Sequence, residues 1–572
     1  MKKKIKPVIF IIALIILFGL IYAGQIAYER LSYTKDKVDL NEYYGLTDQT
    51  QAVLFLNDEL MEEKASYYNE KYYLDFDFVQ EYISNRFYYG EADGILVYTG
   101  PSATYTTVIG ENNITSTAGD NSDLGYPAAL LEDGQLYLAV DYLKKFASMN
   151  YENYVDDGPA RIRIYVGSEH ESLTGTLKKD VAIRKLGGRK SEIVSMAPAG
   201  TVTIVEEMEE WSRVITADGH IGYLENKNIK DIAPVVVNTD NAEGKVALGE
   251  YTSMSLGTKV NLGFHPIGGV AGNETVSSVL AGTKSLNVVA PTWFSLEGND
   301  GSISSFATHD YITAAHAAGA QVWAAVDNFN NPNGCDTEAV MTHAASRANL
   351  ISNLIQLQAE YGFEGINVDF EQIGESYSRS YVEFLRELSV ACRANQIILS
   401  IDNYVPMNFN DYYDLTEQGI IADYIIIMGY DEHYSGSEEA GSVASIGYVE
   451  NGIKSALEEV PAEKLINAVP FYTRVWTTSG GQLSSKAIHM SAVDGFVSEK
   501  GIELKWDDAT CQYYGENTAS NGDFYQIWSE DAKSLEAKLN VMQASGIAGV
   551  AEWALGFESS DAWDVIANYM AQ

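Results

Sequence analysis

From residue 258 to the C-terminus, short apolar runs alternate with helical patterns, and no other feature of the chain constrains its fold as strongly. Strands that alternate with helices form parallel sheets. Eight runs have the length and composition of strands: Lys259–Phe264, Leu286–Pro291, Gln321–Val326, Gly365–Glu371, Gln396–Asp402, Asp423–Tyr430, Leu465–Phe471 and Ile547–Trp553. They predict an α/β fold, a (β/α)8 TIM barrel over residues 258–572, with an α+β insertion after strand seven (roughly Thr473 to Asp531). The competing architecture is a Rossmann-type sheet, but no Gly-x-Gly-x-x-Gly follows the first strand.

The fourth of these strands carries a polar row. Its apolar residues alternate with Asn367, Asp369 and Glu371, and alternate side chains of a strand share one face. A polar row inside a core is costly unless it lines a cavity or performs chemistry. The alternative is a strand with one face in water. Helical patterns on both sides argue against it, because a parallel strand between helices is covered on both faces.

Polar and aromatic residues also follow the other strands. In a TIM barrel the functional side chains gather at the carboxyl ends of the strands. The candidate ends are Pro291-Thr292-Trp293-Phe294, Asp327-Asn328-Phe329, Met428-Gly429-Tyr430-Asp431, Pro470-Phe471-Tyr472 and Glu552-Trp553. A single aromatic residue is more often part of a core. The prediction of a site therefore rests on the presence of polar and aromatic residues at the ends of several strands.

The fourth strand resembles the signature Asp-Gly-x-Asp-x-Asp-x-Glu of family 18 glycoside hydrolases, the chitinase-like enzymes. The chain keeps Gly365, Asp369 and Glu371 but has Glu364 and Asn367 in place of the first two Asp residues. Met428-Gly429-Tyr430-Asp431 matches the Met-x-Tyr-Asp motif of that family, and Trp553 matches its sugar-floor tryptophan. The resemblance covers roughly the last 315 residues. Within the family it is nearest to the spore-germination and cortex-lytic N-acetylglucosaminidases.

The resemblance implies a role for each candidate residue. Glu371 would be the general acid and then the base that activates water, while Asp369 would accept a hydrogen bond from the acetamido N–H of the substrate. Tyr430 would bind the acetamido carbonyl. Repulsion between the two carboxylates should keep Glu371 protonated. The expected substrate-binding residues are Asn367, Asp431, Trp553, Tyr472 and Trp293.

The departures from the signature also lead to expectations. An amide at position 367 cannot share a proton but can donate a hydrogen bond, so we expect Asn367 to hold Asp369 ionised and oriented. Glu364 lies at the start of the strand and is expected to be structural. His265 and His433 are not spaced as a ligand pair, so no metal and no cofactor are expected.

The N-terminus predicts export. Four lysines in residues 1–6 precede the apolar run Val8–Ala23, and Lys clusters remain cytoplasmic. We interpret residues 7–24 as an uncleaved transmembrane signal-anchor, with the bulk of a bacterial protein outside the cell membrane. A cleaved signal peptide is the alternative, although no clean Ala-x-Ala site follows. The protein would then be secreted.

Several small modules are expected between this segment and the barrel. Residues 25–45 are predicted to form a polar stalk and residues 233–257 a linker. Residues 46–168 contain an internal repeat in which Tyr73–Val79 matches Tyr137–Leu143, and they predict an α+β module that resembles the N-terminal domain of copper amine oxidases. Residues 169–232 read as short strands and resemble a bacterial Src-homology-3-like β-barrel, a module that often binds wall peptides.

Composition excludes one class of partner. The formal net charge of the chain is −41, which argues against nucleic acid because phosphates demand Lys and Arg. The 3 cysteines are far apart and show neither a disulfide framework nor zinc spacing.

Three functional hypotheses follow. The leading one is a membrane-anchored glycosidase that cleaves β-1,4 bonds of N-acetylglucosamine polymers, with peptidoglycan of the cell wall favoured over chitin. The second is a catalytically inactive carbohydrate-binding protein on the same barrel, which the presence of Asp369 and Glu371 argues against. The third is a wall-assembly scaffold that uses the N-terminal modules.

Overall fold

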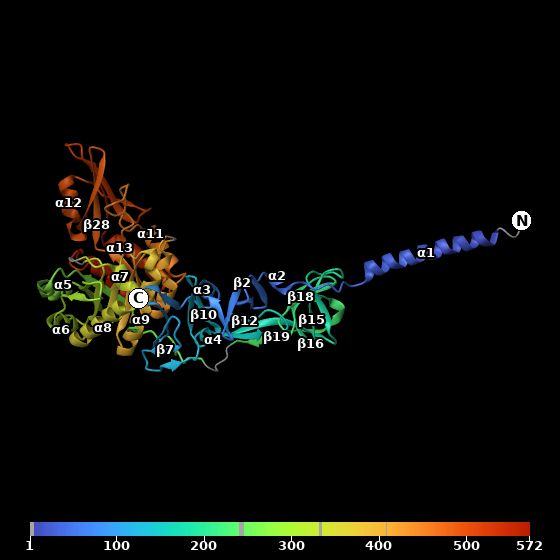
Figure 1. The fold of residues 1–572 in the computed structure, drawn as a ribbon. Helices are drawn as coiled ribbons and strands as arrows, with labels where there is room; N and C mark the ends of the chain where they lie inside the picture. The colour runs from blue at the N-terminus through green and yellow to red at the C-terminus, as the bar shows by residue number, and fades with distance from the viewer. Residues whose placement is uncertain (1–4, 240–244, 331–333, 408) are drawn as a thin grey trace. The chain divides into compact units, whose positions relative to one another are not determined.

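The computed structural model describes residues 5–239, 245–330, 334–407 and 409–572, drawn as a ribbon in Figure 1. Most of the predicted basic tail and part of the predicted linker therefore lie outside the described residues. Contacts divide the chain into two compact units. The first consists of Met1–Phe87, Thr107–Ile114 and Ser122–Ala247, and the second of Tyr88–Thr106, Thr115–Asn121 and Leu248–Gln572.

The second unit contains a closed barrel of parallel strands, which confirms the predicted fold. Its eight strands are β20 (Val260–His265), β21 (Val288–Leu296), β23 (Gln321–Asp327), β24 (Gly365–Asp369), β25 (Ile398–Tyr404), β26 (Tyr424–Met428), β27 (Leu465–Pro470) and β33 (Gly549–Trp553). They pair in chain order, and pairings of β20 with both β33 and β21 close the barrel. A short strand, β22 (Ile303–Ser305), is added antiparallel to β21. The helices are α5 (Val276–Leu280), α6 (His309–Ala317), α7 (Thr337–Thr342), α8 (Ala344–Tyr361), α9 (Ser378–Asn395), α10 (Leu415–Ile421), α11 (Ile446–Ala456), α13 (Ala532–Ser545) and α14 (Ala562–Met570).

Alternation along the strands separates two apolar layers. On β24, Ile366 and Val368 belong to the large cluster formed with the helices. A smaller cluster fills the interior of the barrel and includes Ile398 of β25 and Tyr424 of β26. Side chains with the parity of Asn367 and Asp369 therefore point into the barrel.

The predicted insertion is present after β27. It is a five-stranded antiparallel sheet in the order β29-β28-β32-β31-β30 with one helix. The elements are β28 (Tyr472–Ser479), β29 (Gln482–His489), α12 (Val493–Lys500), β30 (Lys505–Asp507), β31 (Gln512–Thr518) and β32 (Phe524–Ser529). Its first residue, Tyr472, reaches the rim of the barrel, so the insertion contributes to the site described below.

The first unit contains two seven-stranded sheets. One is formed by β1 (Gln51–Leu56), β2 (Glu59–Tyr68), β3 (Lys71–Asp75), β9 (Ala129–Glu132), β10 (Gln135–Ala139), β11 (Met149–Tyr154) and β12 (Arg161–Val166). The repeated segments form the adjacent antiparallel strands β3 and β10 of this sheet. Each strand runs directly into a short helix, α3 (Phe76–Tyr82) or α4 (Val140–Leu143).

The boundary predicted for the repeat module differs from the observed grouping. Residues 88–106 belong to the barrel unit, where they pack on α9. The Tyr88 hydroxyl lies 2.8 Å from Ser380 Oγ, and Thr99 Oγ1 donates to Glu383 Oε1 at 2.5 Å. Glu383 is fully buried and pairs with Arg386 at 3.1 Å. A fragment that begins at the barrel would expose this pair, so the experiments below use the full chain.

The second sheet of the first unit lies where short β-strands were predicted. Its order is β15-β14-β18-β17-β16-β13-β19. The strands are β13 (Glu169–Leu177), β14 (Val181–Arg184), β15 (Ile193–Ala197), β16 (Gly200–Glu207), β17 (Trp211–Ile215), β18 (Ile221–Glu225) and β19 (Ile229–Asn238). The resemblance of this β domain to Src-homology-3 domains remains a prediction.

The polar stalk predicted at 25–45 is not a free segment in the structure. Helix α1 (Ile5–Leu31) continues to Leu31, and the chain then runs along the β domain. Thr34 N donates to Arg189 O at 2.9 Å, Val38 N donates to Ile193 O at 3.0 Å, and α2 (Leu40–Tyr44) follows. The polar composition of residues 25–45 predicted a stalk. The local sequence pattern carries no signal of backbone pairing with a hairpin some 150 residues away in the sequence.

Helix α1 is long and apolar enough to cross a membrane. Its candidate span is Pro7–Leu31, and none of the span is buried against the described part of the protein. The 27 residues of α1 extend about 40 Å at 1.5 Å per residue, which exceeds the roughly 30 Å of a bilayer core. A signal sequence would have the same properties.

Candidate active site

A cavity of about 980 Å³ opens at the carboxyl ends of the barrel strands. Its floor and walls include six of the eight predicted site residues. These are Asp369, Glu371, Tyr430, Asp431, Tyr472 and Trp553. The rim position follows from the fold, because parallel strands that close into a barrel present their carboxyl ends on one face.

Three neighbouring strands each contribute an inward-facing carboxylate at one level. Asp327 of β23 is in register with Asp369 of β24. On β25, Ser400 is in register with Asn367, so Asp402 continues the row beside Asp369. Asp402 was not among the predicted residues. The signal that could have found it is the alternation of Ser400, Asp402 and Tyr404, which share one face of β25.

The carboxylates of this row have different environments. Asp327 accepts hydrogen bonds from Asn330 N at 2.9 Å, Asn330 Nδ2 at 3.0 Å and Ser295 Oγ at 3.1 Å. Asp369 Oδ1, in contrast, is buried and has no hydrogen-bond partner among the described residues. Burial, together with repulsion from Asp402 and Glu371, raises the pKa of Asp369 well above its ordinary value. Burial likewise raises the pKa of Asp402 to about 8.

Glu371 lies just beyond the end of β24 and is held at both its backbone and its side chain. Asn328 Oδ1 accepts from Glu371 N at 2.9 Å, and Asn328 Nδ2 donates to Glu371 O at 2.9 Å. The Tyr404 hydroxyl donates to Glu371 Oε2 at 2.7 Å. Burial is the main cause that raises the pKa of Glu371 above its ordinary value, and the Tyr404 hydrogen bond opposes it.

The hydrogen bond from Tyr404 leads to a prediction. Tyr404→Phe should lower kcat/KM roughly 10- to 100-fold, because a hydrogen bond to a charged group contributes about 1.5–3 kcal/mol. The alkaline limb of the pH–rate profile should move to higher pH, since Tyr404 holds the pKa of Glu371 down. Tyr412→Phe removes a hydroxyl outside the cavity and is the matched control. Equal profiles for the two variants would exclude this role of Tyr404.

Asn367 does not contact Asp369 as expected. Its side chain is fully buried below the cavity, and its Nδ2 donates to Asp402 Oδ1 at 2.8 Å and to Ser400 Oγ at 3.0 Å. We expected the Asn367 amide to hold Asp369 in its ionised form. That expectation is wrong, because the amide binds Asp402 instead and the raised pKa of Asp369 disfavours its ionisation. The reason is that the nearest inward acceptor lies across the sheet on β25 and not along β24.

The residues after β26 join the barrel to its insertion. The Tyr472 hydroxyl donates to Asp431 Oδ1 at 2.5 Å. The rings of Tyr430 and Tyr472 meet edge to face with their centroids 6.2 Å apart. Asp431 has a φ of +58°, a left-handed conformation that costs energy in a residue other than glycine. The turn thus brings a hydroxyl and a carboxylate to the cavity beside Asp369.

The two predicted tryptophans have different environments. Trp553 lines the cavity and packs against Phe264 with a centroid distance of 5.6 Å. Trp293 is 1% exposed, lies in the outer core and donates from Nε1 to Asn273 Oδ1 at 2.8 Å. The expectation that Trp293 binds substrate is therefore corrected. The register between β21 and β23 shifts between Thr292 and Phe294, and this bulge turns Trp293 outward.

Neither predicted rim histidine belongs to the catalytic row. His265 Nδ1 lies 2.8 Å from the Tyr311 hydroxyl, and burial lowers the pKa of His265 to about 4. His433 Nδ1 donates to Ser442 O at 2.8 Å. Within the described ranges, no group of three His, Cys, Asp or Glu side chains is arranged to hold a metal ion.

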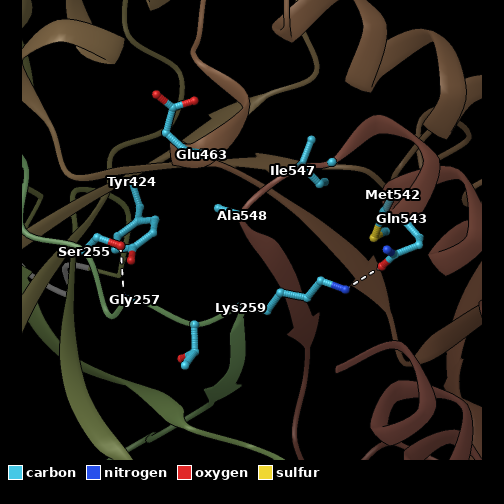
Figure 2. A pocket seen from close by; sticks show the side chains of 11 residues that line it. Ser255, Gly257, Lys259, Tyr424, Glu463, Met542, Gln543, Ile547 and Ala548 are labelled. Atoms are coloured by element: carbon cyan, nitrogen blue, oxygen red, sulfur yellow. Dashed lines mark hydrogen bonds between the residues drawn. The ribbon is translucent and has the colours of Figure 1, made fainter. Parts of the chain in front are cut away.

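A second cavity, of about 430 Å³, lies at the opposite end of the barrel (Figure 2). Lys259 precedes β20 and donates to the Gln543 side chain and to Tyr569 O. Ala548 precedes β33, so this cavity lies at the amino ends of the strands. That face of a TIM barrel serves stability and not chemistry.

Comparison with known proteins agrees with the geometry of the rim. The model of the family "Glycosyl hydrolases family 18" matches residues 248–558. The chain belongs to family 18 of the glycosyl hydrolases. Its enzymatic class is therefore glycosidase.

Three relatives illustrate the similarity. An uncharacterised glycosylase of Bacillus subtilis is 26% identical over 49% of this chain and 84% of its own length. The cortical fragment-lytic enzyme of Bacillus anthracis is 24% identical over 41% of this chain, and the match spans 55% of that enzyme. The crystal structure of a chitinase from Chromobacterium violaceum has a TM-score of 0.50 and 24% identity over 55% of this chain and 100% of its own. The last match shows the fold alone.

Proposed function

We propose that this family 18 glycosidase is anchored in the membrane, faces the cell wall and cleaves β-1,4 bonds of N-acetylglucosamine polymers with retention. The observation that carries the proposal is the rim cavity, where Asp369 and Glu371 both have raised pKa values and face Tyr430 and Trp553. Glycoside cleavage needs an acid on the leaving oxygen and a group that stabilises the oxocarbenium-like centre. Both requirements can be met by these side chains.

The first step assigns the proton. Glu371 has the raised pKa and partly exposed position that a general acid needs, and it gives its proton to the glycosidic oxygen as the bond to C1 breaks. The acetamido oxygen of the substrate bonds to C1 from the other side, as in substrate-assisted family 18 catalysis. The leaving sugar departs with the proton of Glu371, and an oxazolinium-type ring remains.

The second step returns the proton. The Glu371 carboxylate accepts a proton from a water molecule, and the water oxygen bonds to C1 as the ring reopens. Asp369 accepts a hydrogen bond from the acetamido N–H and balances the positive charge of the ring. Tyr430 donates to the acetamido oxygen, Trp553 supplies an apolar floor for the sugar, and Asp431 with Tyr472 binds sugar hydroxyls.

Asp402 adds a proton-holding partner for Asp369. Two neighbouring buried carboxyls titrate as a pair, and burial raises the pKa of both, so the pair keeps one proton at neutral pH. When Asp402 carries that proton, Asp369 is ionised and can stabilise the intermediate. Asn367 fixes the position of Asp402 through its 2.8 Å hydrogen bond, which lowers the pKa of Asp402 against the larger effect of burial.

This pairing predicts opposite pH shifts for two substitutions. Asp402→Asn removes the carboxyl whose charge helps to raise the pKa of Asp369, so Asp369 titrates alone at a lower pKa and the acidic limb of the kcat/KM profile moves down by roughly one pH unit. Asn367→Asp adds a carboxyl beside Asp402 and should move the profile up. Ser400→Ala removes the other partner of Asn367 without a charge change and is the control. A loss of rate with an unshifted profile in both variants would show that the two residues act only structurally.

The preference for peptidoglycan rests on two observations. Helix α1 is long enough to hold the enzyme at the membrane, next to the wall. The similar cortical fragment-lytic enzymes are named for a wall-derived substrate. The test is the rate at which the full chain in detergent releases reducing ends from purified peptidoglycan and from a chitin hexamer. A tenfold preference for chitin would overturn the substrate, and binding of both without turnover would favour a catalytically inactive carbohydrate-binding protein.

A further inference from the structure

The hairpin between β14 and β15 is a strongly basic segment of an acidic chain. Residues 184–190 read Arg-Lys-Leu-Gly-Gly-Arg-Lys and contain no acidic residue, while the whole chain has a formal net charge of −41. Lys185, Arg189 and Lys190 are exposed, and Leu186 at the tip is 64% exposed. Lysines and arginines around an exposed leucine are the composition of segments that rest on an anionic membrane surface.

The hairpin is fixed directly beside the end of helix α1. Lys190 Nζ donates to Ser32 Oγ at 3.1 Å, one residue beyond the last residue of the helix. Thr34 N donates to Arg189 O at 2.9 Å, and Arg184 Nη1 donates to Thr34 O at 3.2 Å. At no more than about 3.6 Å per residue, the hairpin cannot lie more than about 10 Å from the end of α1.

Tyr33 holds the hairpin beside the segment that follows helix α1. Its hydroxyl donates to Glu225 Oε2 at 2.8 Å. Its ring lies under the guanidinium of Arg184 at 5.2 Å, the guanidinium of Arg189 at 5.4 Å and the ammonium of Lys227 at 5.9 Å. Glu225 also pairs with Arg189 and Lys227, so two cations share one carboxylate and positive charge remains in excess. The basic side chains around Tyr33 therefore retain positive charge that can bind an external anion.

The sequence of α1 sets the depth of the hairpin. If the apolar run up to Ala23 fills the hydrocarbon core, the last turns of the helix, from Gln25 to Leu31, cover about 10 Å at 1.5 Å per residue. That length is enough to cross the headgroup layer of one leaflet, which is about 5–8 Å thick. Tyr28 is 74% exposed on these turns and has the amphipathic character of an interfacial anchor. The hairpin thus falls at the outer edge of the headgroups.

We infer that the 184–190 hairpin binds the phosphates of anionic phospholipid headgroups and seats the β domain on the membrane surface. The inference rests on the proposed anchoring by α1 and goes beyond it, because an anchor alone requires no contact between the β domain and lipid. The cations pair with lipid phosphate while Leu186 enters the headgroup layer. This contact fixes the distance between the membrane surface and the β domain, from which the rest of the chain continues toward the wall.

The test uses the full chain in nanodiscs. One set contains phosphatidylglycerol and phosphatidylcholine in equal parts, and the other contains phosphatidylcholine alone. We expect amide hydrogen exchange in residues 184–191 to be at least tenfold slower in the anionic discs, since each basic residue near an anionic surface contributes about fivefold in affinity. High salt should remove the difference, because the charges are exposed.

Two variants separate the inference from charge effects in general. Lys185→Gln with Lys190→Gln should abolish the lipid dependence, while exchange in β16 and β17 stays unchanged and reports an intact domain. Lys454→Gln with Lys486→Gln removes the same charge from exposed positions of the barrel unit and should change nothing. Equal exchange in the two lipids, or a lipid difference that survives the first variant, would overturn the inference.

Other outcomes are also decisive. Suppose that poly(glycerol phosphate), added in detergent, slowed hydrogen exchange in the hairpin, and that the lipid composition of the discs had no effect. The hairpin would then be assigned to a wall polymer, and the lipid assignment would be overturned. Failure of the chain to enter the discs would contradict anchoring by α1, and with it the inference. Activity on peptidoglycan is measured separately, so failure of the glycosidase proposal would not be confused with either result.

Discussion

Glu371→Gln should lower kcat at least 1,000-fold on a fluorogenic N-acetylglucosamine oligomer, with little change in KM. A positioned general acid contributes about 10²- to 10⁴-fold, and here the same group must also activate water. Glutamine keeps the size of the side chain and can still accept the hydrogen bond from Tyr404. Binding and folding should therefore persist while proton transfer is lost.

The matched control for this substitution is Glu375→Gln. Glu375 is an exposed carboxylate four residues further along the chain and does not line the cavity. The Glu375→Gln substitution removes the same negative charge as Glu371→Gln but does not change the site. If Glu371→Gln retained more than a tenth of the wild-type kcat, another group would have to be the acid.

Asp369→Asn should lower kcat about 100- to 1,000-fold and at the same time leave the protein as stable or more stable. The activity falls because a preorganised charge beside the developing positive centre is lost. The pKa of the buried Asp369 carboxyl is raised in the folded state. A carboxyl with a raised folded pKa costs stability as pH rises above its unfolded value near 4, so its removal should raise Tm at pH 7 by a few degrees.

Asp327→Asn provides the contrast. Asp327 accepts hydrogen bonds from the Asn330 and Ser295 side chains and from the backbone of Asn330. Its substitution should lower Tm, because an amide cannot accept all of these bonds. Thermal unfolding and turnover of both variants, measured side by side, check the prediction. A lower Tm for Asp369→Asn would contradict the electrostatic account of its burial.

The barrel could be predicted because its signals are local. Alternation of strand and helix patterns, together with the rule that parallel strands end on one face, places Asp369, Glu371, Tyr430 and Trp553 at one rim without a structure. Asp402 and Tyr404 have the same parity on the next strand. Tyr404 was missed because that strand was expected to end at Asp402, whereas β25 continues to Tyr404. Asp402 stood at the expected end of the strand, but no motif singled it out.

The remaining differences come from contacts between distant parts of the chain. The bulge that turns Trp293 into the core appears only in the pairing of β21 with β23. The partner of Asn367 is set by the neighbouring strand, and the packing of Thr99 on Glu383 joins residues 284 positions apart. The same holds for the Ser32–Val38 segment on the β domain. Composition and periodicity describe single segments and cannot encode such pairs.

The most direct test of the central claim is the chemical identity of the new chain end. Purified peptidoglycan would be digested by the full chain in detergent, reduced with borohydride and analysed by mass spectrometry, beside Glu371→Gln. Cleavage at N-acetylglucosamine, with Glu371 as the acid, predicts fragments that end in reduced N-acetylglucosamine from the wild type and none from the variant. Fragments that end in reduced N-acetylmuramic acid, or no new ends while the wall is still bound, would contradict it.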